Sequence, residues 1–514
     1  MAAVLLLGIL AVPVAAGALA FRARSRRAME AINLIGFGAL LLLAVALAAE
    51  VLRTGSVSIW NGFLAADSLS ALVVLLTAFV SCAPVANRPT SADREALSRA
   101  QILLGSDDER NHVFETDVLR RATISSLHQY YSLTPLFVFS MLLVALANNL
   151  GVMWIAIEAT TLASVFLISF YGRATSIEAA WKYAMIGGVG LSMALFGTIL
   201  TYYSAHHLVE TETLAGLNWS VLVLNAPQFD KTTMKLAFIL ILLGYGTKAG
   251  IAPMHTWKPD AYSEAPVPVA AMLAAAVLNC ALYGLIRFYV LTTKCLGPQF
   301  ASDLLIIFGL LSVGVAVPFV LVQRSFRRLL AYSSIDHGGI MILGLGFGGG
   351  LGALGMLLHL TFHSITKPLL FFCAGNVEQH LRSDLFRRAK GGIIHSMPVS
   401  GPIFLMATLA VTGTPPFSMF QSEFTILRAG FGGANYFPAI LMIVLLSAIF
   451  IGFLVHIAKL VLGADPGLPP ADSCPWKKYS LIGLASVVLI LGFWLPGPLF
   501  QLIQNAAQIA GASR

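Results

Sequence analysis

Long apolar runs separated by short polar segments make up most of this sequence. A helix needs roughly 20 apolar residues to cross the hydrocarbon core of a bilayer, and hydropathy predicts about 14 such spans. They lie near Ala2–Ala20, Ile32–Val51, Ser68–Ala83, Pro135–Asn148, Val152–Phe170, Trp181–Tyr203, Leu236–Ile251, Val267–Tyr289, Leu304–Val322, Ser333–Phe347, Gly352–Ala374, Pro402–Leu427, Pro438–Leu462 and Leu481–Phe500. The pattern predicts an all-α polytopic membrane protein.

The composition agrees with this fold class. Of the 514 residues, 58% are hydrophobic and 11% are charged, whereas soluble proteins carry about 25% charged residues. The formal charge of +8 does not indicate nucleic-acid binding, because the basic residues fall in particular short loops. The five cysteines lie far apart without C-x-x-C spacing, so they predict no disulfide framework and no iron–sulfur or zinc site. We therefore expect no cofactor and no metal in this chain.

Lysine and arginine are unevenly distributed among the loops. The basic loops carry Arg22, Arg24, Arg26, Arg27, Arg173, Lys258, Arg324, Arg327, Arg328, Arg382, Arg387, Arg388, Lys390, Lys477 and Lys478. The alternate loops carry only Arg53, Lys231, Lys294 and Arg428. Because cytoplasmic loops are enriched in basic residues, we expect the basic set in the cytoplasm and both termini outside the plasma (inner) membrane. An even number of spans agrees with this orientation, because it puts both termini on the same side of the membrane.

The longest polar stretch, Pro84–Ser132, falls on the predicted cytoplasmic side. It contains the charged segments Ser106–Arg110 and Arg120-Arg121. Such mixed charge fits a solvated insertion or a docking surface for a partner, or else a flexible loop.

One predicted span carries a lysine next to a helix break. Lys248 lies deep in an apolar run, and Gly250 and Pro253 follow it. Proline removes a backbone hydrogen bond, and hydrocarbon tolerates the freed groups only beside a wet or protein-packed cavity. An intramembrane lysine costs a few kcal/mol, so it indicates an ion pathway. The alternatives are a lysine that snorkels to the interface or a merely kinked helix.

A carboxylate lies two predicted spans earlier. Glu158 interrupts the apolar run Trp154–Thr161. A nearby cation would keep it ionised, and Lys182 at the head of the next helix is the candidate. Lys182 is also close enough to a helix end to reach water instead.

Three ionisable residues share one helix face in the second half. His359, His363 and Lys367 are spaced i, i+4, i+8, and Pro368 follows the lysine. Neutral imidazoles accept and donate protons, so this stripe suits a proton relay, and the proline predicts a kink. Asp336-His337, one predicted span earlier, either feed that relay or cap a helix.

Glu423 follows a second break, at Pro415-Pro416. This break and the one at Pro253 are about five spans apart, and paired interrupted segments indicate internal repeats with a site at each break. The ionisable groups then follow one another as carboxylate, amine, imidazole, amine and carboxylate. Because the charge on each group changes the proton affinity of the next, the proton affinities are coupled along the row.

With these residues the sequence resembles the antiporter-like, proton-translocating membrane subunits of complex I, Mrp antiporters and membrane-bound hydrogenases. The resemblance covers about Ser68 to Leu462 and is carried by Trp154–Thr161, Gly246–Pro268, Leu330–Gly339, His359–Gly375 and Thr412–Leu427. Within this family the sequence is most similar to component F of the hydrogenase-4 type complexes, in the segments Glu158–Ser164, Leu278–Tyr283 and Ser422–Gly430.

The resemblance implies a fold of 14 transmembrane helices with two inverted five-helix repeats, each with a discontinuous helix. The expected parts of the single membrane domain 1–514 are N-terminal helices with a cytoplasmic loop at 84–132 (1–133), repeats at 134–294 and 303–463, and a C-terminal helix at 464–514.

The resemblance also implies residue roles. Glu158 would be the first acid, Lys182 its modulating partner and Lys248 the key lysine. His363 and Lys367 would form the central connection, and Glu423 the terminal acid. Asn279 stands where several relatives have lysine or histidine, so water or His255 would have to bridge Lys248 to Lys367.

The leading hypothesis is a proton-translocating subunit of a complex I-like or group 4 hydrogenase-type redox complex. Its partners would be other membrane subunits and a hydrogenase or dehydrogenase peripheral arm, and electron transfer would occur on the soluble partner subunits. The alternative is a subunit of a Mrp-type cation/proton antiporter. A degenerate scaffold is disfavoured, because unpaired charges in a membrane are costly to keep.

Overall fold

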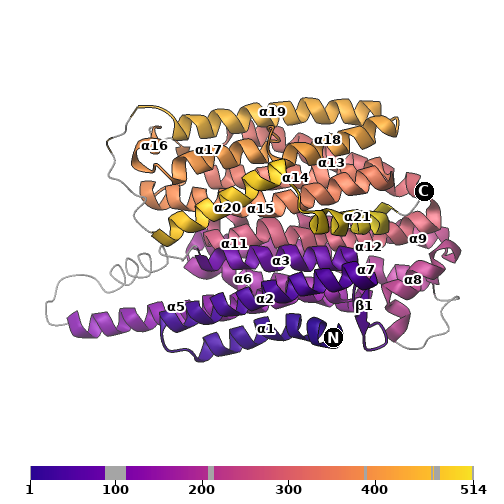
Figure 1. Cartoon of the computed structure of the whole chain (residues 1–514), viewed down its shortest axis with the longest axis horizontal. Helices are drawn as coiled ribbons and strands as arrows, with labels where there is room; N and C mark the ends of the chain where they lie inside the picture. The colour runs from indigo at the N-terminus through magenta and orange to yellow at the C-terminus, as the bar shows by residue number, and fades with distance from the viewer. Residues whose placement is uncertain are drawn as a thin grey trace.

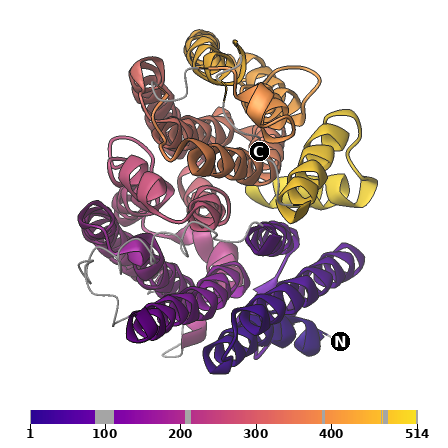
Figure 2. The same ribbon diagram turned by 90° about the vertical axis from the view of Figure 1, so that its left-hand side faces the viewer.

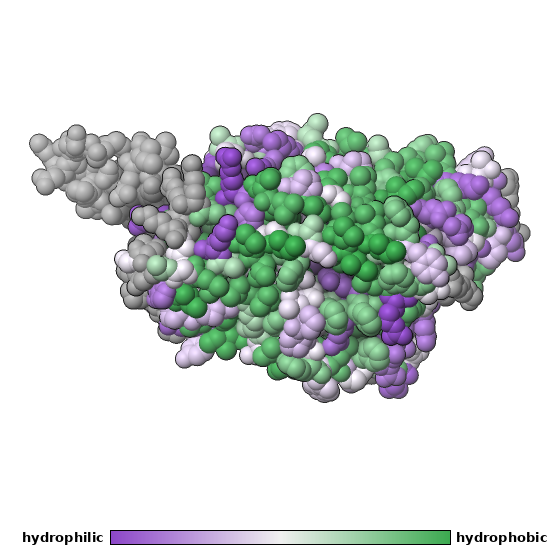
Figure 3. Space-filling model, turned by 90° about the horizontal axis from the view of Figure 1, so that it is seen from above, coloured by the Kyte–Doolittle hydropathy of each residue, from purple (hydrophilic) through white to green (hydrophobic). Residues whose placement is uncertain are grey.

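The computed structural model is a bundle of long helices whose axes run in broadly the same direction (Figure 1). It describes residues 2–86, 112–205, 214–386, 391–464, 467 and 475–511. Within those ranges, 10 helices are long and apolar enough to cross a membrane. Apolar side chains cover the middle of the face in Figure 3, and many of its hydrophilic residues lie toward the two ends. This distribution is that of a polytopic membrane protein.

The two ends of the helix bundle serve as reference points. We call the end with the turn between α1 and α2, near Arg24, the arginine end, and the opposite end, with the strands β1 and β2, the hairpin end (Figure 1). The N-terminal elements are α1 (Ala2–Arg22), α2 (Arg26–Thr54), β1 (Val57–Ile59), β2 (Leu64–Ala66) and α3 (Ser68–Ala86). The N and C labels both lie toward the hairpin end.

The next set of helices contains the first break. Its elements are α5 (His112–Leu146), α6 (Leu150–Ile168), η1 (Ser169–Tyr171), α7 (Ala174–Ala205), η2 (Leu214–Leu217), α8 (Trp219–Asn225), η3 (Ala226–Gln228), α9 (Lys231–Ala249), α10 (Trp257–Glu264), α11 (Val267–Met272), the π turn η4 (Leu273–Val277) and α12 (Leu278–Leu296). Asp230 begins α9 by accepting the Thr233 amide at 2.7 Å, and left-handed Gly250 ends it.

The following set contains the second break. Its elements are α13 (Pro298–Val322), α14 (Phe326–Phe347), α15 (Gly349–Leu381), α16 (Ile393–Ser396), α17 (Ser400–Val411), α18 (Ser418–Gly432) and α19 (Tyr436–Val461). Both predicted interruptions are therefore present, since α9 stops before Pro253 and α17 stops before Pro415-Pro416. By contrast, α15 continues through Pro368.

The two sets run in opposite directions. α5 ends at the hairpin end, where Ala147 pairs with Leu64 of β2. α12 also ends there, beyond the contact of Arg287 with Asp67, so α13 begins at this end and runs to Arg324 at the arginine end. Figure 2 shows the first set and the second set as neighbouring groups, with the C-terminal helices beside the second.

The C-terminal span differs from its prediction. Instead of one helix over Leu481–Phe500, the chain forms α20 (Pro475–Phe493) and α21 (Gly497–Gly511), separated at Pro496. α20 ends at the level of the second break, where the Gly492 carbonyl accepts from Gln421 at 2.8 Å. α21 packs between α15 and α3, with Ile503 and Ala506 buried. Proline ended the helix here because it cannot continue the backbone hydrogen bonds.

The predicted polar loop is shorter than expected. Helix α5 begins at His112, within the stretch expected to be loop to Ser132. The segment Ser106–Arg110 lies outside the described residues. The apolar pattern located only the second part of α5, because the polar sequence from His112 to Ser132 gives no hydropathy signal.

Two helices form the centre of the bundle. Within the spans Val267–Leu296 and Gly349–Leu381, every residue of an apolar 18-residue stretch is buried, whereas only 28% of such a stretch is buried in the outer helix Tyr436–Val461. A helix buried all round has no lipid-facing side, so any polar residue on it faces protein. The second of these helices, α15, carries the predicted histidine stripe.

Candidate functional site

The histidine and lysine stripe of α15 lies at the protein centre. His359, His363 and Lys367 are all fully buried, as their spacing predicts for one face of an internal helix. Across from them, α14 supplies Asp336 and His337, which are also buried. The helix-cap interpretation of that pair is wrong, because both residues lie in the middle of α14.

The three imidazoles form a cluster in which His337 and His359 are hydrogen-bonded, whereas His363 packs against the His337 ring and has no hydrogen-bond partner among the described residues. His337 Nδ1 and His359 Nε2 are 2.9 Å apart, and the His337 and His363 ring centroids are 5.1 Å apart. His359 Nδ1 also lies 3.0 Å from Ser422 Oγ of α18. The His359 ring therefore bridges two polar groups, and it can accept at one nitrogen and donate at the other, as proton transfer through a chain requires.

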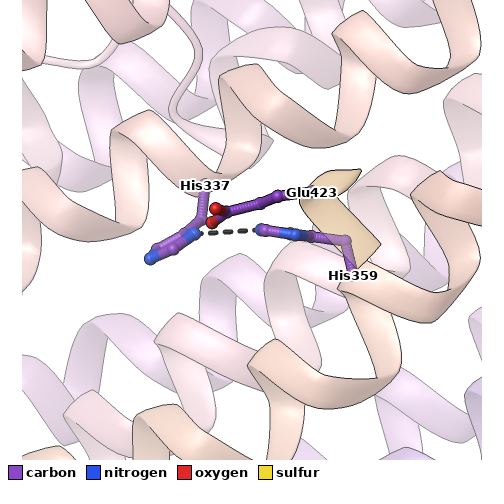
Figure 4. A group of neighbouring side chains, drawn as sticks. All are labelled: His337, His359 and Glu423. Carbon is purple, nitrogen blue, oxygen red and sulfur yellow. Dashed lines mark hydrogen bonds between the residues drawn. The ribbon is translucent and has the colours of Figure 1, made fainter. Parts of the chain in front are cut away.

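Glu423 approaches this cluster from α18. Its carboxylate points toward the His337 and His359 rings in Figure 4, and the three ligand atoms lie within 4.8 Å of one another. The carboxylate occupies space beside left-handed Gly413 of the second break, where a Cβ would collide with Glu423 Oε2. The break therefore makes room for the acid.

The same three residues have a donor set that could hold a divalent metal ion, since two imidazoles and a carboxylate are common ligands. The two imidazole nitrogens are already hydrogen-bonded to each other at 2.9 Å. That contact is the one a proton relay uses, whereas a metal would have to replace it.

Lys367 lies at the other end of the stripe. Its Nζ donates to Ser333 Oγ at 2.8 Å and to the Leu330 carbonyl at 3.2 Å. Asp336, one helical turn beyond Ser333, interacts electrostatically with this ammonium group. The hydrogen-bond partners of Lys367 therefore come from α14.

Lys248 is buried at the end of α9, next to the first break. Its Nζ donates to Thr161 Oγ1 of α6 at 2.7 Å and to the Tyr183 hydroxyl of α7 at 2.6 Å. The Tyr183 hydroxyl also lies 2.7 Å from Ser164 Oγ. The snorkelling alternative is therefore wrong, since this ammonium is held inside the protein by hydroxyl groups.

Glu158 and Lys182 do not pair in this structure. Lys182, whose side chain is 45% exposed, contacts Glu178 at 2.7 Å and Asp260 at 3.0 Å. Glu158 is half-buried, and its Oε2 has no hydrogen-bond partner among the described residues. The predicted pairing of Glu158 with Lys182 is absent because Lys182 lies near the arginine end, where Asp260 and Arg328 also pair.

Two further predicted residues follow the first break along the chain. His255 is buried in the segment between α9 and α10, and its Nδ1 lacks a hydrogen-bond partner within the part of the chain that the structure describes. Asn279 is fully buried on α12, where its Nδ2 donates to Ser364 Oγ of α15 at 2.7 Å. Neither residue contacts Lys248 or Lys367 in the hydrogen bonds of the described residues.

Sequence reasoning missed a buried lysine. Lys258 was assigned to a basic loop, yet it is 1% exposed on α10. Its Nζ donates to the carbonyls of Ala249 at 2.8 Å and Ser334 at 2.9 Å. The available signal was its position ten residues after Lys248, in the segment that continues the broken span.

Sequence reasoning also missed a buried ion pair at the hairpin end. Arg287 of α12 binds Asp67, which precedes α3, through two contacts of 2.7 and 2.8 Å. The guanidinium also donates to Ser70 and Tyr283. The pair links the N-terminal helices to α12.

Comparisons with known proteins identify related chains. A family model described as NADH:quinone oxidoreductase/Mrp antiporter, transmembrane, matches residues 147–452. The chain is 38% identical over 384 residues to a hydrogenase-4 component F homolog of Methylacidiphilum infernorum, covering 74% of this chain and 79% of that protein. It is 30% identical over 412 residues to an NADH-quinone oxidoreductase subunit N of Desulforudis audaxviator, covering 77% and 80%.

Solved structures share the fold. A chain of the archaeal membrane-bound sulfane sulfur reductase superposes with a TM-score of 0.83 at 23% identity, covering 99% of this chain and 97% of that one. A chain of the Mrp complex from Dietzia superposes with a TM-score of 0.81 at 19% identity, with the same coverage. At these identities the likeness is one of fold.

Proposed function

Because this chain belongs to the NADH:quinone oxidoreductase/Mrp antiporter transmembrane family, we propose that it is the proton-translocating membrane subunit of a complex I-like or group 4 hydrogenase-type redox complex. It is an antiporter-like membrane subunit, similar to those of complex I, Mrp and hydrogenase-type complexes. The redox assignment follows the identity of 38% to a hydrogenase-4 component F homolog.

The observation that carries the proposal is a row of ionisable groups across the centre of the protein, all of them buried except Glu423, which is half-buried. It includes Lys248, Lys367, the three imidazoles and Glu423, drawn from α9, α14, α15 and α18. Charges in so poorly solvated a region interact by several kcal/mol, so a change at one site shifts proton affinity at the next. In this proposal Glu158, Lys182 and His255 serve the first half of the pathway.

The architecture we propose has 14 transmembrane helices and two inverted repeats of five. Its support is the opposite direction of the two sets and the presence of one break in each, between α9 and α10 and between α17 and α18. In each set a charged residue lies within ten residues of the break, Lys248 in one and Glu423 in the other. Sites at discontinuous helices are where transporters handle ions.

We further propose that the protein resides in the plasma (inner) membrane with the arginine end in the cytoplasm and both termini outside. The support is the concentration of arginine at that end, in the turn at Arg22–Arg26 and in Arg324–Arg328. Tests with cysteine labelling at the two ends from outside intact cells would measure the orientation.

The proposed partners are other membrane subunits and a peripheral arm that carries the redox centres. The names of similar proteins include a hydrogenase-4 component, an NADH-quinone oxidoreductase subunit and a sulfane sulfur reductase complex. The second candidate function, a subunit of a cation/proton antiporter, is favoured by the fold shared with the Mrp complex. Mass spectrometry of proteins that co-purify in mild detergent distinguishes the two, since only the redox complex brings iron–sulfur subunits.

The test of proton translocation is Lys248→Met in the whole complex. We expect proton uptake into inside-out membrane vesicles to be abolished, because the methionine keeps the side-chain length but binds no proton. The electron donor is first chosen by testing NADH, reduced ferredoxin and H2 on the parent complex. Lys231→Met, an exposed lysine on the same helix, is the control. Normal proton uptake by an assembled Lys248→Met complex would refute the proposal.

A further inference from the structure

Lys258 lies between two lysine sites that belong to different halves of the fold. Its Nζ donates to the carbonyl of Ala249, the residue directly after Lys248, at 2.8 Å. It also donates to the carbonyl of Ser334 at 2.9 Å, and the preceding residue, Ser333, accepts a hydrogen bond from Lys367. Lys258 is therefore hydrogen-bonded to the backbone beside the Lys248 site and to the backbone beside the Lys367 site.

The hydrogen bonding of Lys258 suits both protonation states. A lysine ammonium has three donors, and two carbonyl acceptors hold the Lys258 nitrogen. A neutral amine has two N–H groups, which those carbonyls can satisfy. Among the described residues no carboxylate forms an ion pair with Lys258, so the third proton is not fixed to an acid partner. Such a group can release a proton and remain in place.

The first break provides the space for this side chain. Gly250 has a φ of 71°, and a Cβ there would lie 2.6 Å from Lys258 Cδ and 3.2 Å from its Nζ. The aliphatic stem therefore packs directly over the left-handed glycine that ends α9. The backbone geometry of the break and the position of the lysine depend on each other.

The electrostatic surroundings couple Lys258 to the second half of the row. Its ammonium interacts attractively with Asp336 and repulsively with Lys367. When Lys367 is protonated, a charge on Lys258 is disfavoured, and loss of the Lys367 proton reverses this. His255 is the other titratable group that interacts with it from the break.

Asn279 is a buried residue that cannot take up a proton. Its amide is buried on α12 and donates to Ser364, next to His363 on α15. An amide holds no exchangeable charge, so a proton passing between Lys248 and Lys367 needs another titratable group. Of the buried residues described above, Lys258 is the one that donates both to Ala249, next to Lys248, and to Ser334, next to the Ser333 that binds Lys367.

We infer that Lys258 is the proton carrier that connects Lys248 with Lys367, in place of a titratable residue at Asn279. A proton passes from the Lys258 ammonium to the neutral Lys367 amine, which leaves a neutral Lys258 amine held by two carbonyls. The Lys248 ammonium then supplies the replacement proton and becomes neutral. This inference rests on the proposed function.

The test compares Lys258→Met and Lys258→Arg with the parent complex in the same vesicle assay. Arginine keeps the charge and the donors but does not deprotonate in proteins. We expect both variants to lose proton uptake by at least about tenfold, since positioned proton-transfer groups contribute that much or more. A purely structural lysine would instead be replaced successfully by arginine, so normal uptake in Lys258→Arg overturns the inference.

A double variant tests the relation to Asn279. We expect Asn279→Lys to restore proton uptake in the Lys258→Met background, because it returns a titratable group to the proton pathway. A double variant as inactive as Lys258→Met contradicts the bridging role. Assembly is checked by native gel electrophoresis, and Lys258→Arg covers the case in which Lys258→Met fails to assemble.

The Lys248→Met variant separates this inference from the proposed function. Loss of uptake in Lys248→Met with normal uptake in both Lys258 variants overturns the inference alone. Normal uptake in all three variants overturns the inference and the proposed function together.

Discussion

At the scale of single residues, the protein holds the buried lysines Lys248, Lys258 and Lys367 with neutral hydrogen-bond partners. Lys248 is held by hydroxyl groups, Lys258 by two carbonyls, and Lys367 by one hydroxyl and one carbonyl. A lysine tied to an acid at hydrogen-bond distance would be fixed in its charged form, whereas neutral partners tolerate both forms. The buried lysines are thus arranged to change charge.

Glu423 differs from the lysines in being half-buried at the edge of the histidine cluster. We predict that Glu423→Gln lowers proton uptake by roughly a hundredfold, because the amide fills the same space but cannot carry a proton. Vesicle uptake driven by the native electron donor measures the effect.

The matched control is Asp303→Asn, an exposed acid on α13 that bonds to Gln299. It should leave uptake unchanged. An unaffected rate in Glu423→Gln would remove this acid from the proton pathway and leave the histidine cluster without a terminal group.

At the scale of elements, each helix break leaves space for one ionisable side chain. Gly250 faces the stem of Lys258 at the first break, and Gly413 faces the Glu423 carboxylate at the second. Both glycines have positive φ, 71° and 68°, a backbone conformation that other residues adopt at a cost. The interruptions therefore position side chains as well as ending helices.

We predict that Gly413→Ala impairs proton uptake while the subunit still assembles. The added Cβ would occupy the position of the Glu423 carboxylate and displace it from His337 and His359. The strain of the left-handed backbone adds about 1 kcal/mol. Uptake in vesicles and the amount of assembled complex are measured together.

Gly432→Ala on α18 serves as the control, since nothing lies within 4 Å of a Cβ placed there. The interpretation of Gly413 as space for the acid fails if Gly413→Ala translocates protons at the parent rate.

At the scale of the whole molecule, long-range contacts join the N-terminal helices to the two sets. Asp67 and Arg287, 220 positions apart, form a bidentate pair whose side chains are 20% and 6% exposed. The Arg287 guanidinium also lies 4.3 Å from the centre of the Trp219 ring. The C-terminal helix α21 also packs against both α3 and α15.

We predict that Arg287→Met destabilises the subunit by about 3 kcal/mol, because it leaves the Asp67 charge without its partner in a buried site. Thermal unfolding of the purified complex in detergent should show a lower transition temperature.

The double variant Arg287→Met with Asp67→Asn should recover part of that loss, since no uncompensated charge remains. If the double variant is less stable than Arg287→Met alone, the pair does not act through its charges.

The sequence by itself determined the elements, because the signals for them are local. Apolar runs gave most of the long helices, prolines gave the two breaks, and i, i+4, i+8 spacing gave the buried face of His359, His363 and Lys367. The predicted bounds of the spans were wrong where local signals end, as at the polar start of α5 and at Pro496.

Only the tertiary structure decided the partners of the charged residues. Lys248 binds Thr161 and Tyr183, which are 87 and 65 positions away. Lys258 looked like a loop cation until the packing of α10 against α7 and α14 buried it. The physical reason is that hydropathy and helical periodicity describe a segment's own environment, whereas electrostatic partners depend on which faces of distant helices meet.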